Sequence, residues 1–222
     1  MELAEKLSRM EAALFDMDGT LLDSMPAWRG CNIEYLESVG IHPTDEQKLM
    51  IVCASSGTIL FDYIRENFGI EVDVEKFREL QRARMEVAYA KGNLAKPGAR
   101  EFIDKLRARG VKTVLATATW KSLTAIALEN SGLSDAFDAI CCCDVVGASK
   151  SNPEYFDRVS AMIGVPKDRC VLFEDAIYAI QTGLKAGLLG VVALTDPTNV
   201  IFRKEIAGMS DAMVDSLAEL PL

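Results

Sequence analysis

The stretch AALFDMDGTLL, residues 12–22, decides how the rest of the chain is interpreted. An apolar run over residues 12–15 leads directly into Asp16 and Asp18, and the sequence then turns apolar again. Burying two carboxylates costs free energy unless a partner compensates for the lost water. We therefore expect the fold to use this acidic pair at a functional site, at the end of a buried strand.

The bulk composition is that of a globular protein. The chain has 222 residues, half of them hydrophobic, which suffices for one domain or a domain with an insert. No apolar run approaches the roughly 18–20 residues that a membrane span needs. Scattered charges over residues 1–15 leave no apolar signal-peptide core, so we expect a cytoplasmic protein. Three of the six cysteines are consecutive, which suits neither a disulfide framework nor CxxC metal spacing.

The charge balance narrows the range of partners. Against 33 acidic residues there are only 24 basic ones, and the formal net charge is −9. Since no cluster of lysines or arginines offsets this, electrostatic binding to nucleic acid or to an anionic membrane is not expected. A small anionic substrate fits only if its site supplies local positive charge.

The hydrophobic pattern divides the chain into two kinds of sequence. A short apolar run at residues 11–16 predicts a strand, and residues 26–90 read as helices almost throughout. After Lys96-Pro97-Gly98 the pattern alternates between helices and strands. The predicted helices are 98–109, 120–132, 153–164, 176–187 and 198–207, and the predicted strands are 111–117, 136–142, 169–175, 188–195 and 212–216.

Alternation of apolar strands with helices predicts an α/β fold, in which a parallel sheet is covered by helices on both faces. The helical block that follows the first strand is then an insertion into this fold. Ligands of such sheets bind at the carboxyl ends of the strands. The residues that end the predicted strands are Asp16 to Asp18, Thr117, Asp144 to Lys150, and Glu174-Asp175.

These strand ends combine groups that suit one chemistry. Asp16, Asp18 and Asp175 offer the hard oxygen ligands that Mg²⁺ prefers. Thr117, just before a predicted helix, and the ammonium group of Lys150 could hold an anion. Metal, lysine and helix N-terminus together fit a phosphoryl group in transfer, and an aspartate is a competent nucleophile toward phosphorus.

In these positions the chain resembles the haloacid dehalogenase superfamily, specifically its phosphatase and beta-phosphoglucomutase-like branch. The D-x-D-G-T motif of that branch stands at residues 16–20. The second-motif Ser/Thr matches Thr117, the third-motif Lys matches Lys150, and the acidic pair of the fourth motif matches Glu174-Asp175. The resemblance covers essentially the whole chain. It implies a Rossmann-like catalytic core, residues 1–24 plus 93–222, and an all-helical cap at residues 25–92 that is inserted after the first motif.

The resemblance also implies roles for the acidic residues. Asp16 would be the nucleophile and a Mg²⁺ ligand. Asp18 would be the general acid and then the base, with its backbone carbonyl on the metal. Asp175 would be a further metal ligand, with Glu174 either a ligand or directly behind it. The branch that removes halogen uses a single aspartate and no metal, so Asp18 argues against that chemistry.

The phosphoryl group would be held by Thr117, Ala118 and Lys150, and Lys150 would also balance the charge of Asp16. Specificity would lie in the cap, where Arg29, Asn32 and Arg65 are polar candidates that either face the substrate or stay solvated. Trp120 follows the Thr117 turn and could line the mouth of the pocket, whereas Trp28 is expected to face the core.

We therefore expect a Mg²⁺-dependent phosphatase acting on a small phosphomonoester, a sugar phosphate or similar metabolite, through an aspartyl-phosphate intermediate. The alternative is a sugar-phosphate mutase, but such relatives often carry a Lys after the second motif and an Arg in a Gly-rich cap loop. Here Trp120 and the stretch CASSGTI, residues 53–59, occupy those places. A non-catalytic binding protein on the same fold is a third hypothesis. The partner would be a small phosphorylated metabolite, and the protein a monomer or weak dimer.

Overall fold

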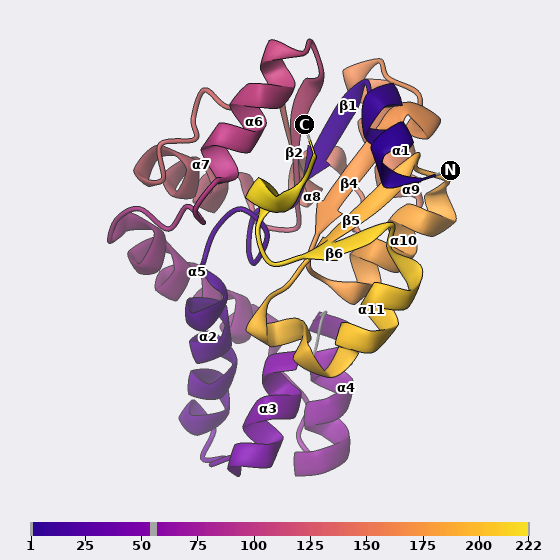
Figure 1. The fold of residues 1–222 in the computed structure, drawn as a ribbon. Helices are drawn as coiled ribbons and strands as arrows, with labels where there is room; N and C mark the ends of the chain where they lie inside the picture. Colours follow the sequence, from indigo (N-terminus) through magenta and orange to yellow (C-terminus); the bar gives the residue numbers. More distant parts are fainter. Residues whose placement is uncertain (1, 54–56, 222) are drawn as a thin grey trace.

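The computed structural model of the protein describes residues 2–53 and 57–221 and contains one parallel six-stranded sheet (Figure 1). The strands lie in the order β3-β2-β1-β4-β5-β6. Their bounds are β1 Ala12–Phe15, β2 Lys112–Thr117, β3 Ala139–Cys142, β4 Cys170–Glu174, β5 Gly190–Leu194 and β6 Ala212–Val214. The predicted parallel sheet is confirmed.

The central strands are buried on both faces, as their unbroken apolar sequences predict. Successive residues of β1 alternate, so that Ala13 and Phe15 belong to one core cluster and Ala12 and Leu14 to the other. The Phe15 ring stacks on Phe173 of β4 at 4.7 Å between centroids. This packing fixes the two strands whose ends carry the acidic motifs.

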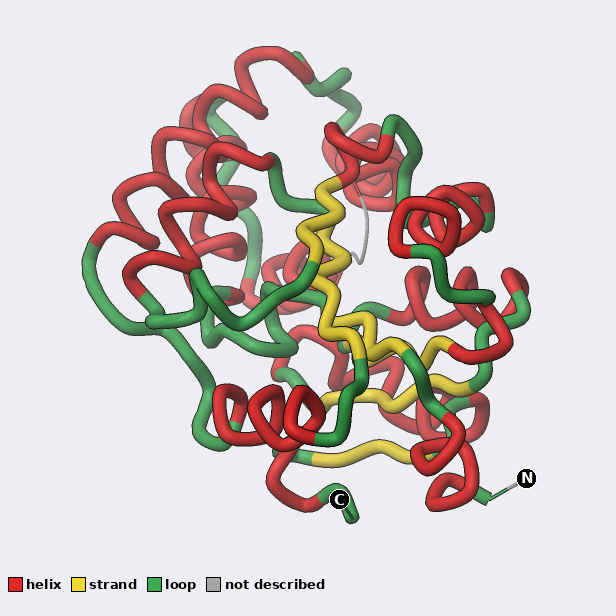
Figure 2. The backbone as a smooth tube through the Cα atoms, turned by 90° about the horizontal axis from the view of Figure 1, so that it is seen from above, coloured by secondary structure: helices red, strands yellow, loops and turns green. Residues whose placement is uncertain are grey.

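Helices cover both faces of the sheet (Figure 2). On one side side chains of α1 (Leu3–Arg9), α6 (Ala99–Ala108) and α7 (Lys121–Asn130) enter the first cluster. On the other side the second cluster contains residues of α8 (Cys143–Val146), α9 (Glu154–Ile163), α10 (Ile177–Ala186) and α11 (Arg203–Met209). Three short 3-10 helices complete the chain: η1 Lys167–Arg169, η2 Pro197–Phe202 and η3 Leu217–Glu219.

Among the described residues five helices lie between β1 and β2, and the first four of them form an insert at one end of the sheet (Figure 1). They are α2 Met25–Ser38, α3 Asp45–Cys53, α4 Gly57–Phe68 and α5 Val74–Ala90. This insert has an apolar cluster of its own, formed by Tyr35, Leu36, Ile51, Leu60, Ile64 and Phe77. The Asp73 side chain caps α5 by accepting from the Lys76 N–H at 3.1 Å.

Two differences from the predicted elements lie near the ends of the chain, and the short helices α8 and η1 were not predicted either. Helix α1 was not predicted, because only Leu7 of its seven residues is buried and its pattern is mostly polar. The helix predicted at 198–207 begins instead as η2, since the Asp196 carboxylate accepts from the Thr198 N–H and Pro197 follows directly. The six cysteines are free and five are buried. Among the described helices, none is long and apolar enough to cross a membrane.

Candidate active site

The acidic motifs meet at the centre of the sheet. Strands β1 and β4 are neighbours, and the strand order reverses between them, which is where open α/β sheets bind ligands. The ladder continues one residue past β1, because the Asp16 N–H donates to the Phe173 carbonyl at 2.9 Å. Asp16 and the pair Glu174-Asp175 are therefore held side by side by backbone pairing.

Three carboxylates converge at this point. One oxygen each of Asp16, Glu174 and Asp175 lie within 4.8 Å of one another, and all three residues are buried. Burial, reinforced by the charge of Glu174, raises the pKa of both Asp16 and Asp175 well above the ordinary value of 3.8. A cation among these oxygens would relieve this repulsion.

Lys150 supplies the positive charge that the acidic cluster needs. Its side chain is only 1% exposed, and its Nζ donates to Asp16 Oδ1 at 2.7 Å, to Glu174 Oε2 at 2.5 Å and to the Ala116 carbonyl at 2.8 Å. Burial alone would lower the pKa of this ammonium, but the charges of Asp16 and Glu174 outweigh it and raise the pKa well above its ordinary value. Lys150 therefore stays charged and ties β4 to β1.

Glu174 and Asp175 occupy different surroundings within the pair. Glu174 uses its second oxygen to accept the N–H groups of Asp175, at 3.1 Å, and of Ala176, at 3.0 Å. Its carboxylate is thus largely occupied by Lys150 and by the turn after β4. Among the described residues, Asp175 accepts from a side chain only at Oδ1, from Thr20 Oγ1 at 3.2 Å, so it has more free acceptor capacity than Glu174.

Gly19 makes room for Asp175. Its φ is +86°, and a Cβ built on it would lie 2.4 Å from Asp175 Oδ2. Both the left-handed backbone and the close approach require glycine. The Asp-Gly-Thr turn after β1 is therefore shaped around the carboxylate that follows β4.

The carboxylate of Asp18 turns toward three hydroxyl groups from three parts of the chain. Ser24 Oγ donates to Oδ1 at 2.5 Å, Tyr89 Oη donates to the same oxygen at 2.5 Å, and Thr119 Oγ1 donates to Oδ2 at 2.7 Å. Burial, followed by the charge of Asp18, raises the pKa of Tyr89 above its ordinary value, so this hydroxyl stays a donor. Ser24 precedes α2 as its N-cap residue but makes no side-chain cap on that helix.

The turn after β2 brings the second motif to the same edge. Thr117 is buried, and its Oγ1 accepts from the Thr119 N–H at 3.1 Å. Ala118, predicted with it to hold phosphate, is exposed between these two buried threonines. Helix α7 begins shortly after, with Trp120 as its N-cap residue. Thr119 is a contact that the sequence did not single out.

Aromatic side chains join the insert to the core beside this turn. The rings of Trp28 on α2 and Trp120 lie 6.5 Å apart, and the Arg82 guanidinium of α5 lies 5.1 Å from the centroid of the Trp120 ring. Trp28 Nε1 donates to the Tyr89 hydroxyl at 3.3 Å. Trp28 and Trp120 therefore both lie at the junction between insert and core.

The polar residues of the insert separate into two kinds. Arg29 faces the core, where its NH2 lies 3.4 Å from Asp196 Oδ1. Arg65 is half exposed and pairs with its neighbour Asp62 at 2.5 Å, which matches the solvated alternative of the two that the sequence left open. Asn32 accepts weakly from Gln81 at 3.5 Å. Residues 54–56 of the predicted CASSGTI loop lie outside the described residues.

The acidic cluster fits Mg²⁺ by its chemistry. All its donors are hard carboxylate oxygens, they are buried and mutually repelling, and Gly19 keeps the space beside Asp175 clear of a side chain. Asp16 and Asp175 would hold the ion directly, because the oxygens of Glu174 are taken by Lys150 and backbone N–H groups.

A ligand site of buried carboxylates and a buried lysine, at the switch point of a parallel sheet, defines an α/β enzyme. The chain belongs to the haloacid dehalogenase-like hydrolases, whose family model matches residues 10–187. Hexitol phosphatase B of Escherichia coli K12 is 27% identical over 217 residues, covering 94% of this chain and 93% of that protein. The protein SUPPRESSOR OF QUENCHING 1 of Arabidopsis thaliana is 25% identical over 88% of this chain. The matched region is only 19% of the length of that much longer protein.

The fold is shared with solved structures of the same family. The crystal structure of CbbY from Rhodobacter sphaeroides, in complex with xylulose-(1,5)-bisphosphate, superposes with a TM-score of 0.77 at 22% identity. The match covers 95% of this chain and 96% of that one.

Proposed function

We propose that the protein is a Mg²⁺-dependent phosphatase that hydrolyses a small phosphomonoester, a sugar phosphate or similar metabolite, through an aspartyl-phosphate on Asp16. The observation that carries the proposal is the contact of Asp16 with Lys150 at 2.7 Å, inside a cluster with Glu174 and Asp175. A nucleophilic carboxylate beside a permanent positive charge suits attack on a phosphoryl group, whose oxygens are negative.

In this proposal each residue of the site has a defined role. Asp16 Oδ attacks phosphorus, the ester bond to the leaving alcohol breaks, and Asp18 gives that alcohol its proton. Asp18 then takes a proton from water as the water attacks the aspartyl-phosphate, which releases phosphate and restores Asp16. Lys150 and the turn of Thr117 and Ala118 hold the phosphoryl oxygens. Mg²⁺, when bound by Asp16 and Asp175, neutralises charge on the phosphoryl group.

Hydrogen bonds from neighbouring hydroxyl groups orient the carboxylate of Asp18. The Ser24 and Thr119 hydroxyls approach different oxygens of its carboxylate, at 2.5 and 2.7 Å, which fixes the plane of the group. A fixed carboxylate within reach of the leaving group is the geometric requirement for general acid–base catalysis.

We further propose that residues 25–92 form a cap domain that moves as a lid over the core, hinged near 23–25 and 93–97. Support comes from the separate apolar cluster of the insert, because an element with its own core can move as a body. A lid would exclude water while the aspartyl-phosphate forms. The contacts of Tyr89 with Asp18 and of Arg29 with Asp196 belong to the closed position.

Substrate preference would then depend on Arg29 rather than on Arg65. Among the described residues, Arg29 Nε is the only buried side-chain nitrogen or oxygen without a partner. A buried unpaired donor costs about 1–3 kcal/mol, which a substrate oxygen would recover. Replacing Arg29 by Gln should change relative rates across sugar phosphates, whereas Arg65→Gln, the matched surface control, should leave them unchanged.

The test is phosphate release from p-nitrophenyl phosphate and from a panel of hexitol, hexose and pentulose phosphates. We expect turnover with Mg²⁺, none in EDTA, and near-complete loss in Asp16→Asn. Asp18→Asn should lose about 10²- to 10⁴-fold, and least with the aryl ester, whose leaving group needs no acid. Full turnover in EDTA, or near wild-type rates for Asp16→Asn, would refute the proposal.

The mutase alternative shares these first steps and differs in the fate of the phosphoryl group. Product analysis with a hexose 1-phosphate separates the two, because a mutase returns the group to the sugar and a phosphatase releases it. No turnover of any phosphate ester would favour the binding-protein hypothesis.

A further inference from the structure

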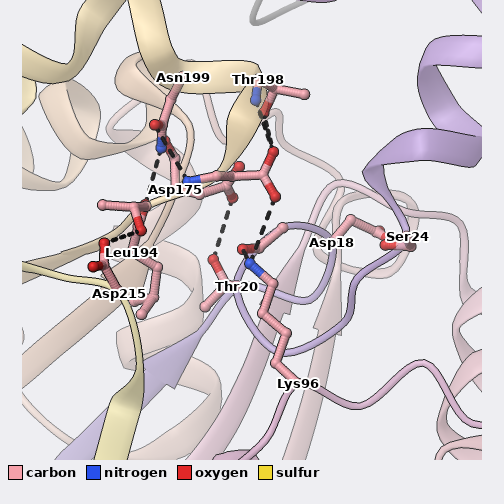
Figure 3. Close-up of polar contacts among 12 residues, drawn as sticks. Asp18, Thr20, Ser24, Lys96, Asp175, Leu194, Thr198, Asn199 and Asp215 are labelled. Atoms are coloured by element: carbon pink, nitrogen blue, oxygen red, sulfur yellow. Dashed lines mark hydrogen bonds and ion pairs between the residues drawn. The ribbon is translucent and has the colours of Figure 1, made fainter. Parts of the chain in front are cut away.

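We propose that Asp196 is a positioning residue that couples the position of the insert to the carboxylate of Asp175, so that closure of the insert and assembly of the metal site support each other. The inference rests on the metal site of the proposed function. It follows from a ring of contacts that runs from Asp175 through the hinge to Asp196 and back, and that Arg29 of the insert joins at Asp196. Figure 3 shows Thr20, Lys96 and Asn199 of this ring around Asp175.

The first half of the ring runs from the acidic cluster to the hinge. Thr20 Oγ1 donates to Asp175 Oδ1 at 3.2 Å, and Gly19 lies against the other oxygen of the same carboxylate. The ammonium group of Lys96 donates to the Gly19 carbonyl. The same ammonium lies 3.5 Å from Asp196 Oδ2, so Lys96 joins the turn after β1 to Asp196.

The second half returns from Asp196 to Asp175 through η2. Asp196 is only 5% exposed, and its Oδ1 accepts from the Thr198 N–H at 2.9 Å and from Thr198 Oγ1 at 2.7 Å. These bonds hold the first turn of η2, which carries Asn199. Asn199 Nδ2 donates to the Asp175 carbonyl at 3.0 Å and to the Leu194 carbonyl at 2.9 Å, so η2 fixes the backbone of the acidic residue.

Among the described residues, Arg29 is the side chain of the insert that pairs with Asp196. The Arg29 NH2 lies 3.4 Å from Asp196 Oδ1, and α3 packs against η2 beside it. Asp196 therefore balances one cation from the hinge and one from the insert. If Arg29 is removed, or moves away as the insert opens, Lys96 is the one cation that still pairs with Asp196 among the described residues. In this inference the loss of the second cation loosens η2.

Direct electrostatics and this coupling predict opposite effects on metal affinity. Arg29 and Lys96 are positive, so through space each repels a cation, and removing either charge should tighten Mg²⁺ binding. In the ring, each of them supports the geometry of Asp175, so removing it should weaken Mg²⁺ binding. The sign of the change therefore separates a positioning role from a simple charge effect.

The experiment is calorimetric titration of MgCl₂ into the full chain and its variants. We expect Asp196→Asn to weaken Mg²⁺ binding about tenfold, as removal of outer partners of metal ligands commonly does. Arg29→Gln should weaken it about fivefold, and this effect should vanish in the Asp196→Asn background. The control is Asp215→Asn. Asp215 and Asp196 both line a cavity of about 600 Å³ beside the hinge, but Asp215 lies outside the ring. Its replacement should therefore change the Mg²⁺ affinity less than twofold.

Each result decides the question. Mg²⁺ binding that is unchanged or tighter in Arg29→Gln would overturn the coupling. If Asp196→Asn does not fold, Lys96→Met tests the same ring, with weaker binding expected and tighter binding overturning it. If the wild-type chain binds no Mg²⁺, the metal site of the proposed function is refuted, and the inference with it. If the wild-type chain binds Mg²⁺ and Arg29→Gln binds it equally well, only the inference is refuted.

Discussion

Replacing Lys150 by Met removes the only side-chain cation that contacts the buried carboxylates Asp16 and Glu174 among the residues the structure describes. The methionine keeps most of the volume of the lysine stem. Breaking a buried ion pair by deleting one partner costs about 3–5 kcal/mol, because the other charges stay buried without compensation. For a chain of this size, each kcal/mol corresponds to about 2–4 °C, so we expect the melting temperature to fall by about 10 °C.

The assay is urea unfolding in EDTA at several pH values, with Lys6→Met as the control. Lys6 pairs with Asp211 at 2.6 Å, but both side chains are about a fifth exposed, so about 1 kcal/mol is expected there. The loss in Lys150→Met should shrink at acidic pH, because the pKa of Asp16 is raised and this carboxyl protonates there. Phosphatase activity should fall on the order of 10²- to 10³-fold. A Lys150→Met chain within about 1 kcal/mol of wild type, at neutral pH, would refute the assignment of Lys150 as the counter-charge of this cluster.

Three further changes test other parts of the site. Gly19→Ala should lower the free energy of unfolding by about 1–2 kcal/mol because of the left-handed backbone, and should also displace Asp175 and abolish turnover. The control is Gly40→Ala. Gly40 has a φ of +81° and no atom within 4 Å of an added Cβ, so this variant should show the backbone cost alone and keep full activity. Tyr89→Phe removes a donor to Asp18, so rates with alkyl phosphates should fall more than the rate with p-nitrophenyl phosphate, and equal losses would contradict an effect on proton transfer. Because burial raises the folded-state pKa of Asp16 and Asp175, their contribution to stability is present below their ordinary value of 3.8 and is lost as pH rises through the raised values. At lower pH, protons compete with Mg²⁺ for these two carboxylates. Mg²⁺ should therefore raise the melting temperature more at pH 8 than at pH 5, and an equal rise at both pH values would contradict the raised pKa values of Asp16 and Asp175.

Much of the fold could be predicted because its signals are local. The strand β1 is an unbroken apolar run, and a parallel strand buried on both faces needs such a run. The acidic residues follow the strands directly, so chain order alone brings Asp16, Glu174 and Asp175 to one edge of the sheet. The strand order itself depends on long-range packing, and no local pattern in the sequence encodes it.

The contacts around the motifs could not be predicted for the same reason. Tyr89 lies in the last turn of α5, in an ordinary amphipathic helix pattern, and nothing local marks its hydroxyl as one of the three that reach Asp18. Asp196 reads as a loop residue and Asn199 as part of the helix predicted at 198–207, and their reach to Arg29 and Asp175 depends on tertiary structure. Arg29 and Arg65 looked equivalent in sequence, and only the direction that each helix faces separates them.

The position of β1 in the middle of the sheet has a consequence for how the chain is made. Ala12 pairs with Lys112 on one side and with Cys170 on the other, and the four helices of the insert lie between β1 and the first of these partners. During synthesis the insert therefore leaves the ribosome, with its own apolar cluster complete, before β1 has any strand to pair with. The nascent chain carries an unpaired apolar strand through this interval, and parallel pairing over such separations is slow. Residues 12–15 are then an apolar segment that stays without a pairing strand until residues 112–117 have been made.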